Sequence, residues 1–289
     1  MAAVPNRSIR SAARDVAHIV RGIPTSDGAG VKLTRVIGQP ALDMLDPFLM
    51  LDEFHSDSAD DYIAGFPSHP HRGFETVTYM LAGRMRHKDN QGNSGLLTAG
   101  SVQWMTAGRG ILHSEMPEQE DGLMWGFQLW VNLPAKDKMT APRYQDIAPE
   151  RIPATTLAPG VTARVLAGEA GGVRGPVEAE ATQALYLDVR LDAGASVEID
   201  VPATHNSFVY VFQGQAQVGS GAAQDLARGD LGVLGSGDRV RIAAPIAPAR
   251  LILVAGKPFN EPVAKYGPFV MNTPQQIVQA VEDFRAGRF

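Results

Sequence analysis

The 289-residue sequence contains no cysteine. This absence excludes disulfides, thiolate zinc sites, iron–sulfur clusters and cysteine nucleophiles, so any metal must be bound by histidine or carboxylate side chains. No apolar run approaches the roughly 18 residues of a membrane span, and no signal-peptide core is found near the N-terminus. We therefore expect a cytoplasmic protein without a membrane partner, or a nuclear one if the organism is a eukaryote.

Positive charge is also scarce, with 26 Lys and Arg against 31 Asp and Glu and a net charge of −5. No basic block stands out, so we expect no direct nucleic-acid binding. Residues 1–21 are rich in arginine, as a transit peptide would be, but they continue into patterned chain without a cleavage-like break and are expected to form an N-terminal arm. Nucleotide-binding and serine-hydrolase motifs are absent.

Alternation of apolar and polar residues, punctuated by Gly, Pro and Asn, recurs along most of the chain and predicts an all-β fold of short strands. Residues 75–81 and 84–88 form a predicted hairpin. Further strands are predicted at residues 101–105, 126–132, 185–191, 197–201, 207–212 and 250–254. The clearest helix is C-terminal, where Thr273 is a predicted N-cap, Pro274 follows it, and Gln276 completes a capping box.

A weak repeat divides the chain into two related halves. Residues 75–83 resemble residues 206–214 at an offset of 131, and residues 97–104 resemble 226–233 at an offset of 129. We predict two antiparallel β-barrels, residues 1–147 with the site discussed next and residues 148–289 ending in the helix. The boundary region between Asp146 and Val177 is rich in Pro and Gly.

Histidine is concentrated in the first half, because five of the seven histidines lie between residues 55 and 113. Even scatter would place only about one there. In an extended chain His69, His71 and Glu75 share one face. A turn-rich stretch can direct His113 and Glu115, which are two residues apart, toward the same interior. These residues predict a metal site of three imidazoles and one or two carboxylates. Nitrogen and oxygen donors without sulfur suit Fe(II), Mn, Ni, Cu or Zn.

The remaining histidines have no partners at ligand spacing, and we expect His55 and His87 to be surface or loop residues. Gln128, Trp130 and Asn132 alternate along one predicted strand, so they are candidates for the lining of a pocket. At the repeat offsets, His69, His71 and Glu75 correspond to Asp200, Pro202 and Asn206, while His113 and Glu115 correspond to Ile242 and Ala244. The second barrel is therefore predicted to bind no metal.

The spacing of His69, His71, Glu75 and His113 resembles the two motifs of the cupin superfamily. Longer stretches are more specific, because residues 66–76, 103–117 and 267–273 resemble the pirin family. The resemblance extends from about residue 30 to the C-terminus. It implies a bicupin in which only the N-terminal barrel holds iron, bound at the positions of His69, His71, His113 and Glu115. Glu75 is then not the fourth ligand, and we expect it to orient one of the imidazoles.

The resemblance also implies an activity, the Fe(II)-dependent opening of a flavonol such as quercetin by dioxygen with release of carbon monoxide. Glu115 would then also accept the proton of the flavonol 3-hydroxyl. The alternative is a non-enzymatic regulator or transcriptional cofactor, in which the iron senses redox state and a protein partner binds nearby. A binding barrel with a purely structural metal is a third hypothesis. The family resemblance suggests a monomer.

Overall fold

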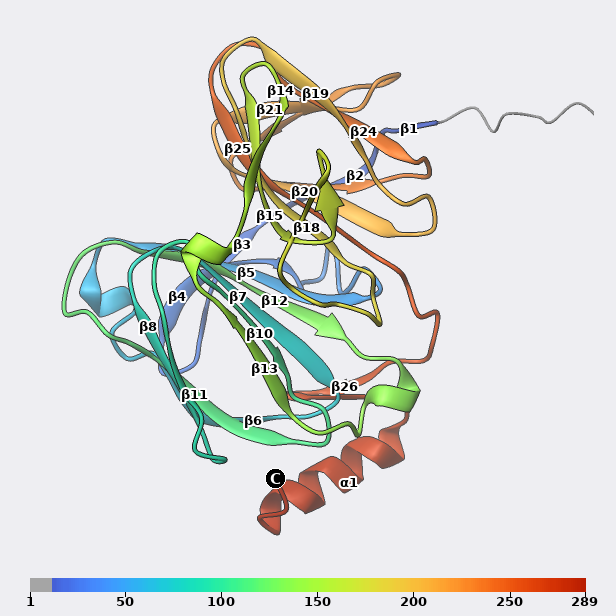
Figure 1. The fold of residues 1–289 in the computed structure, drawn as a ribbon. Helices are drawn as coiled ribbons and strands as arrows, with labels where there is room; N and C mark the ends of the chain where they lie inside the picture. Colours follow the sequence, from blue (N-terminus) through green and yellow to red (C-terminus); the bar gives the residue numbers. More distant parts are fainter. Residues whose placement is uncertain (1–11) are drawn as a thin grey trace, which may run out of the picture.

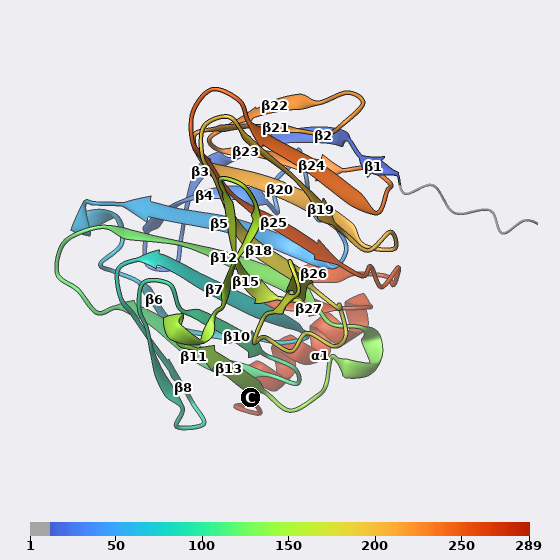
Figure 2. The ribbon, with the colours of Figure 1, turned by 45° about the horizontal axis from the view of Figure 1, so that its top comes forward.

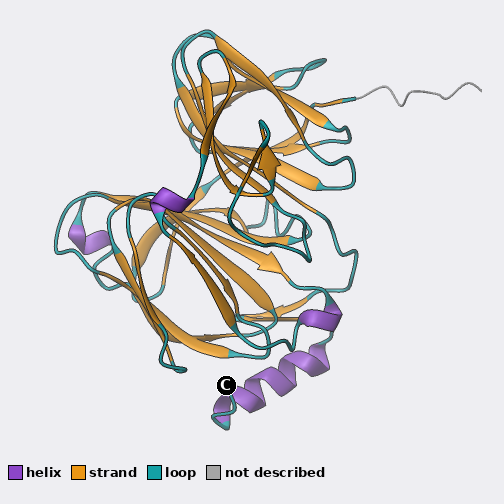
Figure 3. Ribbon diagram, viewed as in Figure 1, coloured by secondary structure: helices purple, strands orange, loops and turns teal. Residues whose placement is uncertain are grey.

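A computed structural model describes residues 12–289, and two antiparallel β-barrels joined face to face make up most of them (Figure 1). The predicted all-β class is confirmed. Figure 3 shows how strands dominate both barrels, with the one α-helix of the described residues lying outside the first barrel.

The first barrel consists of a seven-stranded and a four-stranded sheet. The larger sheet has the order β13–β10–β7–β12–β5–β4–β3, and the smaller has the order β6–β11–β8–β9. Their bounds are β3 (Ile23–Asp27), β4 (Val31–Ile37), β5 (Phe48–Ser56), β6 (Phe66–His71), β7 (Phe74–Ala82), β8 (Met85–Asp89), β9 (Ser94–Leu97), β10 (Val102–Thr106), β11 (Ile111–Pro117), β12 (Met124–Asn132) and β13 (Arg143–Ile147).

The second barrel repeats this arrangement with one seven-stranded and one five-stranded sheet. The larger sheet contains β2 (Val16–Arg21), β14 (Ala154–Ala158), β15 (Val161–Ala167), β18 (Leu185–Leu191), β20 (Asn206–Gln213), β23 (Asp230–Leu234) and β25 (Ala249–Gly256). The smaller sheet contains β1 (Ala13–Arg14), β19 (Ala195–Asp200), β21 (Gln215–Val218), β22 (Gln224–Ala227) and β24 (Arg239–Ala244).

Apart from β1, which has no counterpart in the first barrel, the strand orders of the two barrels correspond one to one, which confirms the internal repeat. In the second barrel the larger sheet runs β2–β23–β20–β25–β18–β15–β14, and β19, β24, β21 and β22 take the places of β6, β11, β8 and β9. Register agrees as well: Met85 pairs with Leu97 in one hairpin, and Ala216 pairs with Leu226 in the other. These pairs reproduce the sequence offsets of 131 and 129.

Both ends of the chain cross the expected division at residue 147. β1 and β2 belong to the sheets of the second barrel, so most of the described part of the predicted N-terminal arm, residues 12–21, is strand. Residues 1–11 lie outside the described residues. At the other end, β26 (Ala264–Tyr266), β27 (Phe269–Met271) and α1 (Pro274–Arg285) return to the first barrel. Arg72 there exchanges backbone hydrogen bonds with Pro268 and Val270.

The two large sheets pack against each other, as the turned view in Figure 2 shows. Their facing side chains form a shared apolar core that includes Val77, Trp104 and Phe127 of the first barrel with Tyr186 and Phe208 of the second. Buried polar pairs cross it, since the Tyr79 hydroxyl donates to Asp188 at 2.6 Å. One face of each large sheet is therefore used for this contact, and the other faces the interior of its own barrel.

The C-terminal helix begins as predicted. The Thr273 side chain accepts a hydrogen bond from the Gln276 backbone, and the Gln276 side chain accepts one from the Thr273 backbone, which completes the capping box. Arg72 forms a 2.7 Å ion pair with Asp283 of α1, and this fixes the helix beside the strand that carries His69 and His71. The remaining short elements are β16 (Glu169–Ala170), β17 (Val173–Arg174) and the 3₁₀ turns Ala59–Asp61, Ala135–Asp137 and Pro149–Arg151.

Candidate metal centre

Three histidines meet inside the first barrel because two neighbouring strands place them there. His69 and His71 lie two apart on β6, so they share a face, and His113 on β11 is directly opposite His69. Their Nε2 atoms converge: His69 Nε2 is 3.0 Å from His71 Nε2 and 2.9 Å from His113 Nε2. Among the described residues these three form the one group of potential ligands close enough to hold a metal ion.

The spacing of these nitrogens is the one that a metal ion requires. Two nitrogens at right angles around a metal, each about 2.1 Å from it, lie about 3.0 Å apart. His69 Nδ1 lies 2.8 Å from the Pro67 carbonyl oxygen, which can only accept a hydrogen bond. His69 therefore carries its proton on Nδ1 and presents a lone pair on Nε2. The residues fit a divalent transition metal.

The surroundings also keep two of the rings in the form that a metal needs. His71 and His113 are 2% and 1% exposed, and burial together with the neighbouring imidazoles lowers the pKa of both well below the ordinary value. A neutral imidazole retains the lone pair that binds a metal. The site is thus ready for a cation at neutral pH.

Glu115 follows His113 on β11 and is 1% exposed. Its carboxylate accepts a hydrogen bond from Thr78 at 3.0 Å and two from Gln128 Nε2 at 3.0 and 3.2 Å. It lies in the same interior as the three imidazoles but is not part of their close group. Thr78 and Gln128 thus give this buried carboxyl group its hydrogen-bond partners.

The structure places Glu75 away from the three histidines, so the expected shared face is wrong. β6 ends at His71, and the turn at Arg72 and Gly73 leads the chain into β7 of the other sheet. Gly73 has a φ of 87°, and a Cβ there would clash with the Val270 carbonyl oxygen, so the turn requires glycine. Because the turn interrupts the alternation, Glu75 points toward the other barrel with Val77 and Tyr79.

The contacts of Glu75 give it a different environment from the predicted one. Its carboxylate accepts a 2.6 Å hydrogen bond from Thr106 rather than from a histidine, and burial raises its pKa. Thr78, which faces the opposite side of β7, is the residue that reaches Glu115.

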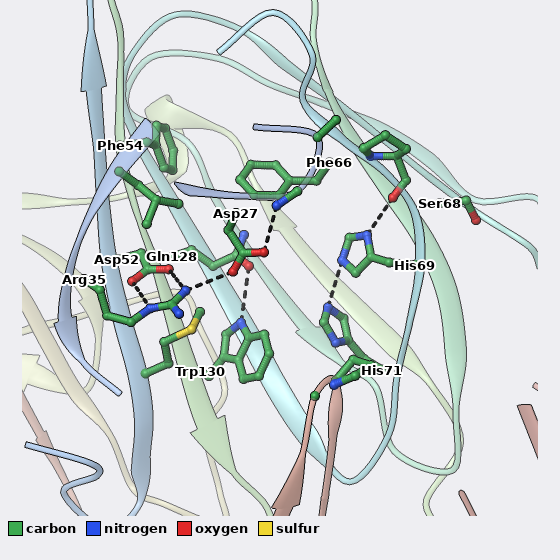
Figure 4. Close-up of a pocket in the computed structure, with 17 residues that line it drawn as sticks. Asp27, Arg35, Asp52, Phe54, Phe66, Ser68, His69, His71, Gln128 and Trp130 are labelled. Atoms are coloured by element: carbon green, nitrogen blue, oxygen red, sulfur yellow. Dashed lines mark hydrogen bonds and ion pairs between the residues drawn. The ribbon is translucent and has the colours of Figure 1, made fainter. Parts of the chain in front are cut away.

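A cavity of about 630 Å³ opens onto His69 and His71 (Figure 4). This volume lies in the usual range for small-molecule sites. Its walls combine aromatic and apolar side chains with a few polar ones, and they come mainly from β3, β4, β5, β6 and β12. The lining residues are Asp27, Gly28, Ala29, Leu33, Arg35, Met50, Asp52, Phe54, Phe66, Pro67, Ser68, His69, His71, Gln128, Trp130, Gly267 and Pro268.

Two of the three predicted pocket residues on β12 line this cavity. The Trp130 ring packs edge-on against His71 at 5.2 Å, and Trp130 Nε1 donates to Gln128 Oε1 at 3.3 Å. Gln128 thus connects the cavity wall to Glu115. Asn132 does not line the cavity: the register of β12 shifts after Trp130, and Asn132 instead accepts a 2.7 Å hydrogen bond from Lys138 Nζ.

An ionic cluster forms the far wall, where sequence patterns gave no signal. Arg35 binds Asp52 through two hydrogen bonds of 2.9 and 2.7 Å and reaches Asp27 at 2.9 Å. The hydrogen bonds and charge of Asp52 raise the pKa of Arg35, which stays positive. The cavity therefore has one fixed cation between two carboxylates.

His87 is also buried, contrary to the expectation of a surface or loop residue. It lies on β8, is 1% exposed, and its Nδ1 is 3.3 Å from His113 Nδ1. His55 is exposed and packs edge-on against Trp125, as expected of a surface residue. His18 is likewise exposed, whereas His205 is 4% exposed and contacts the Gln183 carbonyl.

The interior of the second barrel has apolar residues at the positions of the ligands. Since Val218 corresponds to His87 and pairs with Ile242, Ile242 takes the place of Glu115. Val240 then takes the place of His113, and its partner Ile199 that of His69. The sequence offsets match His69 with Asp200, and they match His113 and Glu115 with Ile242 and Ala244, so they fail at all three positions. The second barrel has one residue more between β19 and β20 and two fewer between β23 and β24. All four replacements belong to one apolar cluster.

Comparisons with known proteins agree with this geometry. A model described as pirin matches residues 30–131, and one described as the pirin C-terminal cupin domain matches residues 186–289. A pirin-like protein of Caulobacter vibrioides is 53% identical over 278 residues, or 96% of this chain and 99% of that protein. The chain belongs to the pirin family. Pirin of Homo sapiens is 46% identical over 264 residues, 90% of this chain and 88% of its own.

Solved structures place this family member among bicupins. A crystal structure of quercetin 2,3-dioxygenase from Acinetobacter baumannii matches with a TM-score of 0.88 and 34% identity, covering 96% of this chain and 99% of that one. The bicupin fold implied by the sequence resemblance is thus confirmed. No helix among residues 12–289 is long and apolar enough to cross a membrane.

Proposed function

We propose that this pirin-family protein is a flavonol 2,3-dioxygenase of the quercetin type, with Fe(II) bound by His69, His71, His113 and Glu115. The observation that supports it most is the convergence of three imidazole nitrogens at a cavity of about 630 Å³, in a chain 34% identical to a quercetin 2,3-dioxygenase. In this reaction a flavonol takes up one dioxygen molecule and releases carbon monoxide as its central ring opens.

The donor set of three neutral nitrogens and one carboxylate suits Fe(II), and Mn, Ni, Cu and Zn are the other metals to be tested. When bound, Fe(II) would supply Lewis acidity toward a substrate oxygen and redox reactivity toward dioxygen. His69 and His71 lie at the cavity surface, so a ligand in the cavity can reach this centre directly.

The chain itself provides the substrate site and a base. Trp130, Phe66 and Met50 offer apolar surface for planar rings, and Arg35 and Asp27 offer polar contacts for ring hydroxyls. Glu115 accepts the proton of the flavonol 3-hydroxyl, which requires its carboxylate to give up part of its hydrogen bonding to Thr78 and Gln128.

The test is metal analysis of the purified protein, followed by oxygen uptake with a panel of flavonols in the presence of the metal found. We expect turnover in the wild type, none in the His69→Ala variant, and a strong loss in the Glu115→Gln variant. His18→Ala is the matched control, because it removes an exposed histidine on β2 of the second barrel and should change neither metal content nor rate.

If the purified protein binds an equimolar amount of the metal but consumes no oxygen with any flavonol, the proposed dioxygenase activity is contradicted. That outcome favours the alternative of a metal-dependent regulator, whose protein partner would then be sought in pull-downs with the metal in its oxidised and reduced states.

A further inference from the structure

Each ring nitrogen of His113 faces a different neighbour. Nε2 points to His69 at 2.9 Å, and Nδ1, on the other side of the ring, points to His87 Nδ1 at 3.3 Å. His87 therefore lies behind His113 as seen from the centre of the three nitrogens. This position excludes it as a ligand, and His87 is accordingly outside the close group of potential ligands.

The register of the sheet fixes His87 in this place. β8 pairs with β11, so that His87 is directly opposite Glu115 and its side chain lies on the same face of the sheet. The side chain is 1% exposed, and its ring packs edge-on against Tyr144 at 4.7 Å. His87 thus touches the site from a rigid strand rather than from a loop.

The hydrogen bond between the two rings determines which nitrogen of His87 carries the proton. If His113 binds a metal through Nε2, its one proton is on Nδ1 and needs an acceptor. That acceptor is His87 Nδ1, which must then be bare, so the proton of His87 is on Nε2. In the described residues His87 Nε2 is buried without a hydrogen-bond partner. A buried N–H group without a hydrogen-bond partner lowers the stability of the fold. A histidine at this position therefore calls for a functional explanation.

We propose that His87 is a positioning residue for the metal centre, accepting a hydrogen bond from His113 Nδ1 and so holding His113 in the tautomer and orientation that bind a metal. The second barrel supports this role, because Val218 occupies the position of His87 where the ligands are also absent. The proposal rests on the proposed metal site but not on flavonol turnover.

Two substitutions separate this role from a structural one. His87→Leu has similar volume but no acceptor, whereas His87→Asn places a carbonyl oxygen close to the position of Nδ1. Leu also removes a buried polar group without a partner, so the Tm of the metal-free protein should not fall. A residue that served only packing would instead lower the Tm and leave metal affinity unchanged. His205→Leu is the matched control, since it removes a buried histidine that lies just before β20 of the second barrel.

The experiment uses Zn²⁺, which is redox-inert, in competition with a chromophoric chelator, together with the Tm of each metal-free variant. We expect His87→Leu to weaken Zn²⁺ binding by about 10- to 100-fold without lowering the Tm, and His87→Asn to restore most of the affinity. In the zinc-loaded wild type, imidazole ¹⁵N spectra should show the proton of His87 on Nε2. A wild type that binds no Zn²⁺ overturns the metal site itself.

If the wild type binds Zn²⁺ and the His87→Leu variant binds it equally well, the metal site stands and the role of His87 is refuted. A proton found on His87 Nδ1 in the zinc-loaded protein refutes it independently. His205→Leu should leave the Zn²⁺ affinity unchanged, and a similar loss there would show that any buried histidine affects binding through the fold.

Discussion

The two barrels share their strand order but differ in what fills them. In the second barrel the inner face of the small sheet is apolar, and Ile199, Val240 and Ile242 are at most 4% exposed within one continuous cluster. In the first barrel the corresponding positions hold imidazoles and a carboxylate beside a cavity. A barrel with this strand order can therefore close around apolar side chains alone, as the second barrel does. The polar interior of the first barrel is not needed for the fold.

The large sheet of each barrel has two faces, and they differ in what they contact. Both use their large sheet to bury apolar side chains against the other barrel. The side chains on the inward face can differ between the two barrels, because only the outward face has to pack against the other barrel. The comparison predicts that substitutions inside the first barrel change metal binding, while those inside the second change stability.

The largest expected effect is the loss of the metal from the first barrel. Replacing both His69 and His113 by alanine removes two of three convergent nitrogens, so metal content should fall to the background of the buffer. Elemental analysis of the purified protein measures this. Metal retained at full stoichiometry would mean that the binding site lies elsewhere and would end the contrast between the barrels.

The second expected effect is a loss of stability without a loss of metal. Ile199→Ala in the second barrel removes buried apolar volume and should lower the free energy of unfolding by about 2–5 kcal/mol. Urea unfolding measures the change, and metal content should stay at the wild-type value. Val278→Ala, an exposed position on α1, is the control and should change the stability little.

The third expected effect is a pH dependence of the free energy of unfolding, caused by Lys138, which contacts Gly73 and Asn132 of the first barrel. Lys138 is 1% exposed, and burial lowers its pKa from 10.5 to about 8. Above pH 8 the unfolded chain thus binds more protons at this group than the folded one, so the free energy of unfolding rises with pH. The expected rise from pH 8 to pH 9.5 is roughly 1–2 kcal/mol.

The check for this effect is the difference in urea unfolding between the wild type and Lys138→Met at both pH values. Tyrosines with raised pKa values act in the opposite direction at higher pH, and the variant shares them, so they cancel. An equal pH dependence in the two proteins would show that the Lys138 ammonium is kept by its hydrogen bonds to Gly73, Asn132 and Val270.

The smallest expected effect concerns α1, which packs beside the first barrel. Thr273→Ala removes the side-chain acceptor of the capping box and should cost about 1 kcal/mol, whereas Thr273→Ser should keep most of the stability. Metal affinity should not change in either variant. A loss of metal in Thr273→Ala would show that the helix supports the ligands, and the contrast would then extend beyond the barrel interiors.

Local sequence patterns predicted the parts of this site that depend on local geometry. His69 and His71 are two residues apart on one strand, and the capping box spans Thr273 to Gln276, so spacing alone is informative. The same rule fails for Glu75, because the two turn residues between β6 and β7 move the chain into another sheet. Alternation does not continue through such a turn.

The rest depends on pairing between distant segments. His87 is isolated in the sequence, and it reaches His113 because β8 pairs with β11, 26 residues away. The ionic wall of Arg35, Asp52 and Asp27 lies on three strands and matches no motif. For the same reason the spacing of residues did not show that both ends of the chain cross between the barrels.

This crossing determines how the molecule can be divided. Because β2 lies in the second barrel, while β27 and α1 pack on the first, a cut in the peptide segment between β13 and β14 leaves each fragment holding part of the other's barrel. The two fragments would stay associated after cleavage. Expressed as separate chains, they should be stable only as an obligate pair, and the metal-binding half could not be isolated by deleting the rest of the gene.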